Sequence, residues 1–318
     1  MSGGVDRFCV LQTEHLAEHW ADWLAQRVEL VRCEHGDPGW EDAAGRAHGL
    51  IVRTYTQVNE SLLDGMPQVR VVGRAGVGLD NIDLDACAQR GITVVHTPDA
   101  NTQAVIEFVM TNLLDAVRQR LIMEAACELT DWQTLRDQHT AGRQLSEMTV
   151  GILGLGRIGR QVARVLAPFG CRVIYHDLLD IPVDHRAGAE PVSQTDLLAQ
   201  SDVLTIHVDS RPENRHLMGT GTLDAMKPEV VLINTARGFV VDALALFHFL
   251  GEHPSAQAWI DVHDPEPFGE DYPLLWCTNA HLTPHLAGKT QAAELAMSAV
   301  VEDVWAVLSG GTARCPAR

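Results

Sequence analysis

The chain has 318 residues, of which 46% are hydrophobic and 21% charged, and this balance predicts an ordinary globular protein long enough for two domains. Its formal net charge of −18, with no cluster of Lys and Arg, argues against nucleic acid as a partner. No apolar run reaches transmembrane length, and the N-terminus MSGGVDRFCV lacks the layout of a signal peptide, so we expect no membrane partner.

The cysteines are scattered along the chain, odd in number and never spaced as C-x-x-C. This spacing indicates reduced thiols in a cytoplasmic protein, with neither a disulfide framework nor a metal site. The seven are Cys9, Cys33, Cys87, Cys127, Cys171, Cys277 and Cys315.

The first hundred residues alternate short apolar runs with amphipathic stretches. The runs are rich in Val and Ile, which is typical of buried parallel strands, and they cover residues 8–13, 28–33, 48–54, 69–74 and 92–97. Helical stretches lie between them, at 16–26, 59–66 and 84–91. Strands that alternate with helices predict a parallel α/β sheet.

A second alternating run begins at Thr149. Its strands are predicted at 149–154, 172–177, 203–208, 230–236, 257–263 and 280–286, with helices that include 160–170 and 242–253. A helix over 101–120 joins the two runs, and a final helix is expected over about 290–308. Because no flexible linker separates the runs, we expect two packed domains with a hinge.

The stretch TVGILGLGRIG places Gly154, Gly156 and Gly159 between a predicted strand and a predicted helix. The first glycine permits a tight turn, the second lets backbone approach a pyrophosphate, and the third lets the helix pack on the sheet. The helix N-terminus offers N–H groups to the phosphates. Three glycines alone are a weak signal, and a plain glycine-rich turn is the alternative.

An acid at the end of the next strand strengthens the dinucleotide interpretation. Asp177 follows Gly154 by 23 residues, where a carboxylate would bind the adenosine ribose hydroxyls. A carboxylate about 5 Å from a 2′-phosphate repels it by roughly 3 kcal/mol at an effective dielectric of about 20, or about two decades in affinity. Leu178 and Leu179 supply no compensating cation, so NAD is predicted over NADP.

Three polar residues follow later predicted strands, at the edge where open α/β sheets bind ligands. These are Arg237, Glu266 and His285. Taken singly, they are also compatible with a surface arginine, a solvated acid and a histidine in a turn; their shared placement favours one site. His281 and His285 are four residues apart, but Pro284 predicts strand or loop there, so we expect no metal.

With these residues in place, the chain resembles the D-isomer-specific 2-hydroxyacid dehydrogenase family over nearly its full length. The resemblance rests on GRAGVGLDNIDLDA, TPDANTQAVIEF, TVGILGLGRIG, SDVLTIHV, INTARGFVVD, DVHDPEP and LTPHLAG, in that order. The first motif and LIVRTYT are most similar to 3-phosphoglycerate dehydrogenase-like members.

The resemblance implies an α/β fold of two Rossmann-like or flavodoxin-like doubly wound parallel-sheet domains with a cleft between them. Residues 1–99 plus 287–318 would form a discontinuous substrate-binding domain, and 100–286 an inserted NAD-binding Rossmann domain. The glycine turn then comes late because the nucleotide domain starts late. A homodimer is also implied.

The resemblance also assigns roles. His285 would exchange the proton, Arg237 would hold the substrate carboxylate and polarise its carbonyl, and Glu266 would favour the imidazolium. Implied cofactor contacts are Gly154, Gly156, Arg157, Ile158, Gly159, Asp177, Thr235, Ala236, Asp261, His285 and Gly288, with Asp261 at the nicotinamide amide and His207 structural or cofactor-adjacent. Implied substrate contacts are Arg53, Arg74, Ala75, Gly76, Val77, Gly78 and Arg237, with backbone N–H groups of 75–78 on the carboxylate.

The substrate stays open between 3-phosphoglycerate and a short acid such as glyoxylate or hydroxypyruvate. Arg53 and Arg74 match positions that resemble phosphate contacts in the phosphoglycerate-type enzymes, and the alternative is that both are salt-bridged at the sheet edge. The stretch after Trp132 does not reproduce the basic cluster of those enzymes.

The predicted function is NAD-dependent interconversion of a small D-2-hydroxy acid and its 2-oxo acid. Two alternatives are an NAD(H)-sensing protein of the corepressor type, which shares the fold and the trio, and a dehydrogenase of another small anion such as phosphite. Glu266 argues against a formate enzyme, since those carry glutamine at this position.

Overall fold

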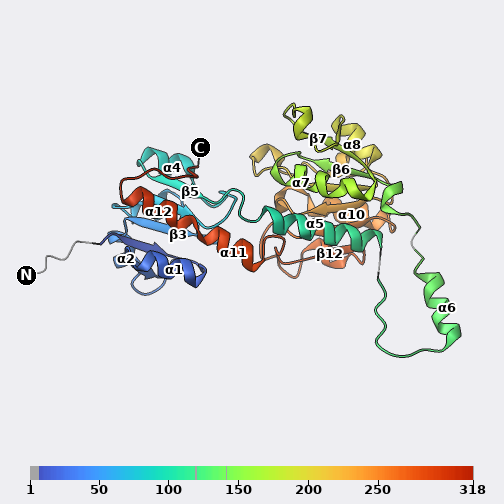
Figure 1. The fold of residues 1–318 in the computed structure, drawn as a ribbon, viewed down its shortest axis with the longest axis horizontal. Helices are drawn as coiled ribbons and strands as arrows, with labels where there is room; N and C mark the ends of the chain where they lie inside the picture. The colour runs from blue at the N-terminus through green and yellow to red at the C-terminus, as the bar shows by residue number, and fades with distance from the viewer. Residues whose placement is uncertain (1–6, 119, 141, 318) are drawn as a thin grey trace, which may run out of the picture. The chain divides into compact units, whose positions relative to one another are not determined.

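The computed structural model describes residues 7–118, 120–140 and 142–317 (Figure 1). Residues 1–6, which begin the stretch inspected for a signal peptide, lie outside this description. The chain divides into two compact units: unit 1 comprises residues up to Gln103 and from Lys289 onward, and unit 2 comprises Ala104–Gly288. Within the described ranges, every helix is too short or too polar to span a lipid bilayer.

Unit 1, as far as it is described, contains a five-stranded parallel sheet in the order β2-β1-β3-β4-β5. The strand order reverses between β1 and β3. In such sheets, ligands bind at the carboxyl ends of the strands next to this reversal. The strands are β1 Cys9–Gln12, β2 Glu29–Arg32, β3 Gly49–Val52, β4 Val71–Arg74 and β5 Thr93–His96. The helices are α1 Glu18–Ala25, α2 Trp40–Arg46, α3 Glu60–Asp64, α4 Leu84–Gln89, α11 Gln291–Ser298 and α12 Val300–Leu308.

Alternate strand residues of unit 1 enter two different cores, because successive side chains in a strand point to opposite faces. Val10 and Ile51 pack with α1 and α12, whereas Leu11 and Leu50 pack with α2, α3 and α4. Both faces of the sheet are therefore covered, as an all-parallel sheet requires. Asn59 and Asp83 cap α3 and α4 by accepting hydrogen bonds from backbone N–H groups.

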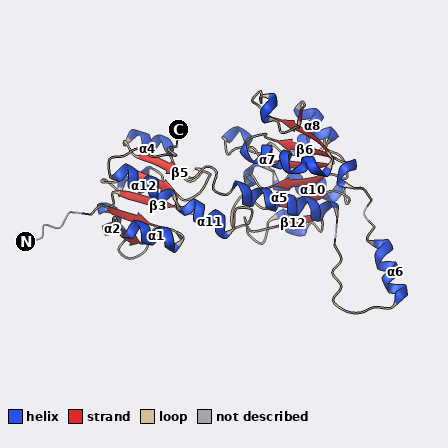
Figure 2. Cartoon of the chain, in the orientation of Figure 1, coloured by secondary structure: helices blue, strands red, loops and turns tan. Residues whose placement is uncertain are grey.

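Unit 2, over its described residues, contains a seven-stranded parallel sheet in the order β12-β11-β10-β9-β6-β7-β8 (Figure 2). The strands are β6 Thr149–Leu153, β7 Arg172–His176, β8 Glu190–Pro191, β9 Val203–Ile206, β10 Val231–Asn234, β11 Gln257–Ile260 and β12 Ala280–Leu282. The α-helices are α5 Thr102–Val117 (whose first residues belong to unit 1), α6 Leu129–Gln138, α7 Arg157–Leu166, α8 Gln194–Gln200, α9 Thr220–Leu223 and α10 Ala243–Glu252. Short 3-10 segments are η1 Leu145–Glu147, η2 Ala167–Phe169, η3 Val183–His185, η4 Pro212–Asn214, η5 Gly238–Val240 and η6 Pro273–Trp276.

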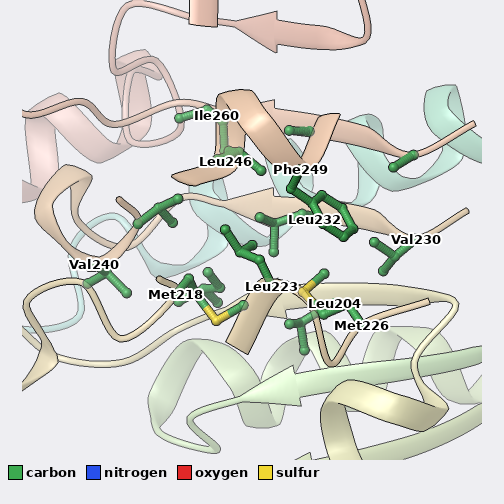
Figure 3. Packing of buried hydrophobic residues seen from close by; sticks show 14 of the residues in the cluster. Leu204, Met218, Leu223, Met226, Val230, Leu232, Val240, Leu246, Phe249 and Ile260 are labelled. Carbon is green, nitrogen blue, oxygen red and sulfur yellow. The ribbon is translucent and has the colours of Figure 1, made fainter. Parts of the chain in front are cut away.

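One core of unit 2 joins the sheet to α10. Figure 3 shows Leu204, Leu232 and Ile260 of three adjacent strands packed with Leu246 and Phe249 of α10. A second core contains residues of α5 and α7, so helices cover both faces of this sheet as well. The predicted α/β class with two doubly wound parallel sheets is confirmed.

Three local predictions were wrong or incomplete. The helix expected over 290–308 is two helices, since it breaks at Ala299, where the buried Ser298 hydroxyl accepts a hydrogen bond from Ala17 N. α2 was not predicted, because its sequence WEDAAGR contains glycine and few large apolar residues. β8 was not predicted, because a two-residue strand leaves no periodic pattern.

Candidate active site

The glycine turn after β6 is fixed by close backbone packing. Gly154 has φ +93°, and a Cβ atom there would stand 2.8 Å from the His207 carbonyl oxygen. A Cβ at Gly159 would overlap the Gly154 carbonyl oxygen. Both positions therefore require glycine, the first for its left-handed backbone and the second for the approach of α7 to the turn.

Gly156 differs from the other two glycines because open space surrounds it. A Cβ there would meet no atom within 4 Å. Gly156 is the N-cap of α7, no side chain of the described residues caps the helix there, and Arg157 and Ile158 are its first helical residues. An uncapped helix N-terminus beside an open backbone suits a phosphate group.

Asp177 connects the end of β7 to the glycine turn. Its Oδ2 accepts a hydrogen bond from Leu155 N at 2.7 Å, and its Oδ1 accepts one from Leu179 N at 2.9 Å. Each carboxylate oxygen can accept a further hydrogen bond, so the residue can still bind ribose hydroxyls. Asp177 thus organises the turn as well as presenting a negative charge.

The turn after β10 presents Thr235, Ala236 and Arg237. Asn234, which is fully buried, shapes this turn: its Oδ1 accepts from Ala236 N and its Nδ2 donates to Arg237 O, both at 3.0 Å. The Thr235 hydroxyl is buried and has no hydrogen-bond partner among the described residues. A buried unpaired hydroxyl is costly, which favours a ligand partner at this place.

Glu266 and His285 form a hydrogen-bonded pair in unit 2. Glu266 Oε2 lies 2.8 Å from His285 Nδ1, and Glu266 Oε1 accepts a hydrogen bond from His263 N at 2.7 Å. Partial burial raises the pKa of Glu266, but the hydrogen bonds from His285 and His263 outweigh it, so the net pKa is lowered. Glu266 is therefore an ionised acceptor that orients the imidazole of His285.

The loop that carries Glu266 is in contact with the loop that carries Arg237. A Cβ at Gly238 would overlap the backbone of His263, so only glycine allows the two loops this close. The His263 ring is buried, with Nε2 2.9 Å from Thr283 O and Nδ1 3.3 Å from the Tyr272 hydroxyl. Because a carbonyl only accepts, Nε2 donates to Thr283 O, and the Tyr272 hydroxyl is the partner of Nδ1.

Asp261 is fully buried and holds the segment around His285. Its carboxylate accepts hydrogen bonds from the Thr283 hydroxyl at 2.5 Å, Leu286 N at 2.7 Å and Ala287 N at 2.8 Å. The sequence interpretation placed Asp261 against the nicotinamide amide. In the structure its observed partners belong to the segment 283–287, which ends next to the predicted cofactor residue Gly288.

In unit 1 the predicted substrate loop follows β4. Ala75 N donates to Val52 O at 2.9 Å and Gly76 N to Arg74 O at 2.8 Å, so these two N–H groups already have acceptors. Val77 and Gly78 contribute the loop's other two N–H groups. Gly76 has φ +154°, and a Cβ there would overlap the Arg74 guanidinium, which explains the glycine.

Arg53 lies beside this loop at the end of β3. Its Nη1 donates to His15 O at 3.3 Å and lies 3.5 Å from Glu294 Oε1. Its backbone N–H donates to Glu14 Oε1 at 2.9 Å. Arg53 is thus salt-bridged, as one of the two sequence interpretations expected.

Two further histidines have local partners. His207 Nε2 is 2.9 Å from the Thr205 hydroxyl, and desolvation lowers the pKa of His207 to about 3, so it is neutral. His281 stacks on Trp259 with ring centroids 4.1 Å apart. In the part of the chain that the structure describes, no three His, Cys, Asp or Glu residues are grouped as a metal site would need.

Comparison with known proteins decides the family. Residues 110–287 match the family model of the D-isomer specific 2-hydroxyacid dehydrogenase, NAD binding domain. The chain belongs to this family. The matched segment lies within unit 2 and contains the glycine turn, Asp177, Arg237, Glu266 and His285.

Similar proteins of this family differ in substrate. The chain is 35% identical over 301 residues to a D-3-phosphoglycerate dehydrogenase of Mycobacterium leprae (strain TN), covering 91% of this chain and 56% of that protein. It is 36% identical over 260 residues to a glyoxylate reductase of Aeropyrum pernix, covering 80% and 78%. The crystal structure of a D-lactate dehydrogenase from Aquifex aeolicus complexed with NAD and lactic acid superposes with a TM-score of 0.81 at 28% identity, covering 95% and 96%. The chain spans little more than half the length of the phosphoglycerate dehydrogenase.

Sequence reasoning missed several residues that position the site in this 2-hydroxyacid dehydrogenase family member. Asn234 ends an otherwise apolar strand, and a buried amide at that position was a readable signal. His263 and Thr283 sit close to predicted residues, but their roles depend on hydrogen bonds between distant loops. Glu14 and Glu294 had no local signal, since each acts through Arg53 from a remote element.

Proposed function

We propose that the protein is an NAD-dependent oxidoreductase that interconverts a small D-2-hydroxy acid and its 2-oxo acid. The observation that carries this proposal is the Glu266–His285 pair, with 2.8 Å between Oε2 and Nδ1, on a loop in contact with the Arg237 turn. Unit 2 would bind NAD, and unit 1 would supply the substrate loop.

The reaction needs a proton donor and an anchor for the substrate carboxylate. Among the described residues, the Nε2 atom of His285 has no hydrogen-bond partner, so it is the nitrogen that would give a proton to the developing alkoxide in reduction and take it in oxidation. Glu266 would hold the imidazole in its orientation through the contact with Nδ1. Arg237 would hold the carboxylate with its planar guanidinium and polarise the neighbouring carbonyl.

The residues around the glycine turn fit a dinucleotide. The open backbone at Gly156 and the α7 N-terminus would hold the pyrophosphate, Asp177 would bind the ribose hydroxyls, and the unpaired Thr235 hydroxyl would meet a polar cofactor atom. When bound, the cofactor supplies or accepts the hydride that is exchanged with the substrate carbon.

The substrate carboxylate would also contact the loop after β4. Because Ala75 N and Gly76 N already donate to Val52 O and Arg74 O, the N–H groups of Val77 and Gly78 are those proposed for the carboxylate. The protein would act in the cytoplasm, which is consistent with its seven free cysteines. It would act as a homodimer.

The test is NADH oxidation, followed by absorbance, against glyoxylate, hydroxypyruvate, pyruvate and phosphohydroxypyruvate, with D- and L-hydroxy acids run in reverse. We expect turnover of at least one 2-oxo acid and selectivity for the D-hydroxy acid. His285→Ala should lower kcat by roughly two to four decades, with NADH binding retained in a fluorescence titration.

His185→Ala is the matched control, because His185 is a similarly exposed histidine of unit 2 (55% against 46% for His285) that lies in η3. Its kcat should stay near that of the wild type. NADH binding without turnover of any acid on the panel would overturn the dehydrogenase proposal and favour a nucleotide-sensing role. Normal kcat in His285→Ala would remove His285 from the mechanism.

A further inference from the structure

Arg53 stands next to the proposed substrate loop in the sheet of unit 1. Val52 pairs with Arg74 in the β3–β4 register, and Val52 O accepts the hydrogen bond from Ala75 N. Arg53 and the loop 75–78 therefore leave neighbouring strands at the same carboxyl edge. A positive charge here would favour a substrate with a second anionic group, unless the charge is already neutralised.

The charge of Arg53 is neutralised from α11. Arg53 Nη1 lies 3.5 Å from Glu294 Oε1, and the Arg53 side chain is only 12% exposed. The same Glu294 oxygen is 2.7 Å from His15 Nε2, which must donate because a carboxylate only accepts. Since His15 O also accepts a hydrogen bond from Arg53 Nη1, the three residues hold one another in place.

A second carboxylate, that of Glu14, accepts hydrogen bonds from the backbone at and after Arg53. Glu14 accepts hydrogen bonds from the N–H groups of residues 53–56, at distances of 2.8–3.2 Å. Burial raises the pKa of Glu14, but these four backbone donors outweigh it and lower the pKa overall, so Glu14 is ionised. Glu14 also lines a groove of about 900 Å³ with two further acids, Glu34 and Glu41. Two carboxylates, those of Glu294 and Glu14, therefore contact Arg53 at this edge of the sheet.

We propose that Glu294 determines substrate specificity by excluding 2-oxo acids with a second anionic group. A distal phosphate or carboxylate near Arg53 would meet the Glu294 and Glu14 carboxylates, and like charges at such distances repel strongly at a partly buried site. The substrate class is then a 2-hydroxy acid with an uncharged tail. This inference rests on the proposed function and narrows it.

The test compares hydroxypyruvate with phosphohydroxypyruvate, which differ only by the phosphate. Wild-type protein should prefer hydroxypyruvate by kcat/KM. Glu294→Gln keeps the size of the side chain and removes its charge, so it should raise the ratio of phosphohydroxypyruvate to hydroxypyruvate about tenfold or more. A wild-type preference for phosphohydroxypyruvate, or an unchanged ratio in Glu294→Gln, overturns the proposal.

Glu302→Gln is the matched control for the loss of one negative charge. Glu302 is equally exposed (36%), lies in unit 1 and pairs with Arg314 at 2.6 Å, with no contact to Arg53. In Glu302→Gln the ratio of kcat/KM for phosphohydroxypyruvate to that for hydroxypyruvate should stay at the wild-type value. A rise equal to that in Glu294→Gln would mean that the overall charge of the protein, and not Glu294, sets this ratio. In the double variant Arg53→Gln/Glu294→Gln the gain in this ratio should be smaller, because the phosphate then loses the Arg53 cation.

A binding measurement separates this proposal from the proposed function. The affinities of 3-phosphoglycerate and D-glycerate for the NAD-loaded protein are compared by calorimetry in wild type, Glu294→Gln and Glu302→Gln. If the affinity for 3-phosphoglycerate rises in Glu294→Gln and not in Glu302→Gln, the charge-exclusion proposal is supported even if no acid is turned over. Turnover without that gain retains the dehydrogenase and refutes the role of Glu294.

Discussion

His285 occupies an unusual backbone conformation. Its φ of +54° lies in the left-handed region, which costs a residue with a side chain of the order of 1 kcal/mol. Its N–H group meets Asp261 O at 2.9 Å and Thr283 O at 3.0 Å, and its ring meets Glu266. These contacts offset the cost and fix the direction of the imidazole. Backbone geometry and side-chain role are therefore set by the same neighbours.

Asp177 is the residue on which the choice between NAD and NADP is predicted to depend. Asp177→Asn removes the negative charge while keeping the size of the side chain. We expect the NAD to NADP ratio of kcat/KM to fall by roughly ten- to a hundredfold, since repulsion of the 2′-phosphate is lost. Steady-state kinetics with both cofactors measure it.

Asp180→Asn is the control for this variant, because Asp180 lies in the same loop and its side chain is 99% exposed. Its cofactor ratio should not change. If Asp177→Asn behaves like Asp180→Asn, the selection of NAD lies elsewhere.

At the residue level, the sequence located the polar residues that follow strands better than the residues that hold them in place. Gly154, Asp177, Glu266 and His285 follow strands at recognisable positions, so their placement could be read locally. The contact between Glu294 and Arg53 could not be predicted, because it depends on α11 meeting the end of β3. The sequence also left both outcomes open for Arg53, since a salt bridge is a tertiary contact.

Between elements, Asp202 joins several parts of unit 2. It is 6% exposed, and its carboxylate accepts hydrogen bonds from Arg143, Lys227 and Thr149 N. Burial raises the pKa of Asp202, but these donors outweigh it and lower the pKa from 3.8 to about 2. Asp202 thereby fixes the starts of β6 and β9, the two strands at which the order of the sheet reverses.

Asp202→Asn should lower the free energy of unfolding at neutral pH by about 2 kcal/mol. A depressed pKa stabilises the fold above the usual value of 3.8, and the contribution is lost as the pH falls from there toward about 2. The difference from wild type in chemical denaturation should therefore shrink over this range. Asp184→Asn, at a site that is 79% exposed, is the control and should change the free energy of unfolding little. A pH-independent difference would show that lost packing is responsible.

Element prediction succeeded where apolar runs were long and failed where they were short. Val- and Ile-rich runs such as 149–154 and 230–236 correspond to β6 and β10, because buried parallel strands need apolar residues on both faces. β8 has two residues and could not be recognised. The break at Ala299 depends on Ser298 meeting Ala17, and helical periodicity alone continues through it.

At the scale of the whole molecule, α6 is the segment that we expect to take part in the proposed homodimer. None of the residues of α6 is buried, even though two of them have large apolar side chains: Leu129 is 70% exposed and Trp132 is 48% exposed. Leu121 and Ile122, which precede α6, are also exposed. Exposed apolar groups within such a short stretch of sequence are typical of an interface. We expect α6 to contact a second copy in the proposed homodimer.

Light scattering should give the mass of a dimer for the wild type and of a monomer, at least in part, for Leu129→Asp. Leu178→Asp introduces the same change at a site that is 73% exposed outside α6 and should leave the dimer intact. A wild-type monomer would refute the dimer, and a fully dimeric Leu129→Asp would place the interface elsewhere.

The contact between Gly238 and the His263 backbone also limits how the protein can be engineered. Arg237 and Glu266 are far apart in the sequence, yet their loops fit together only while position 238 has no side chain. If one of these two loops is replaced by the corresponding loop of a related protein, the other loop loses the backbone that it packs against. Loop grafts intended to alter substrate preference therefore have to replace residues 234–240 and 261–266 together, with both loops taken from the same relative.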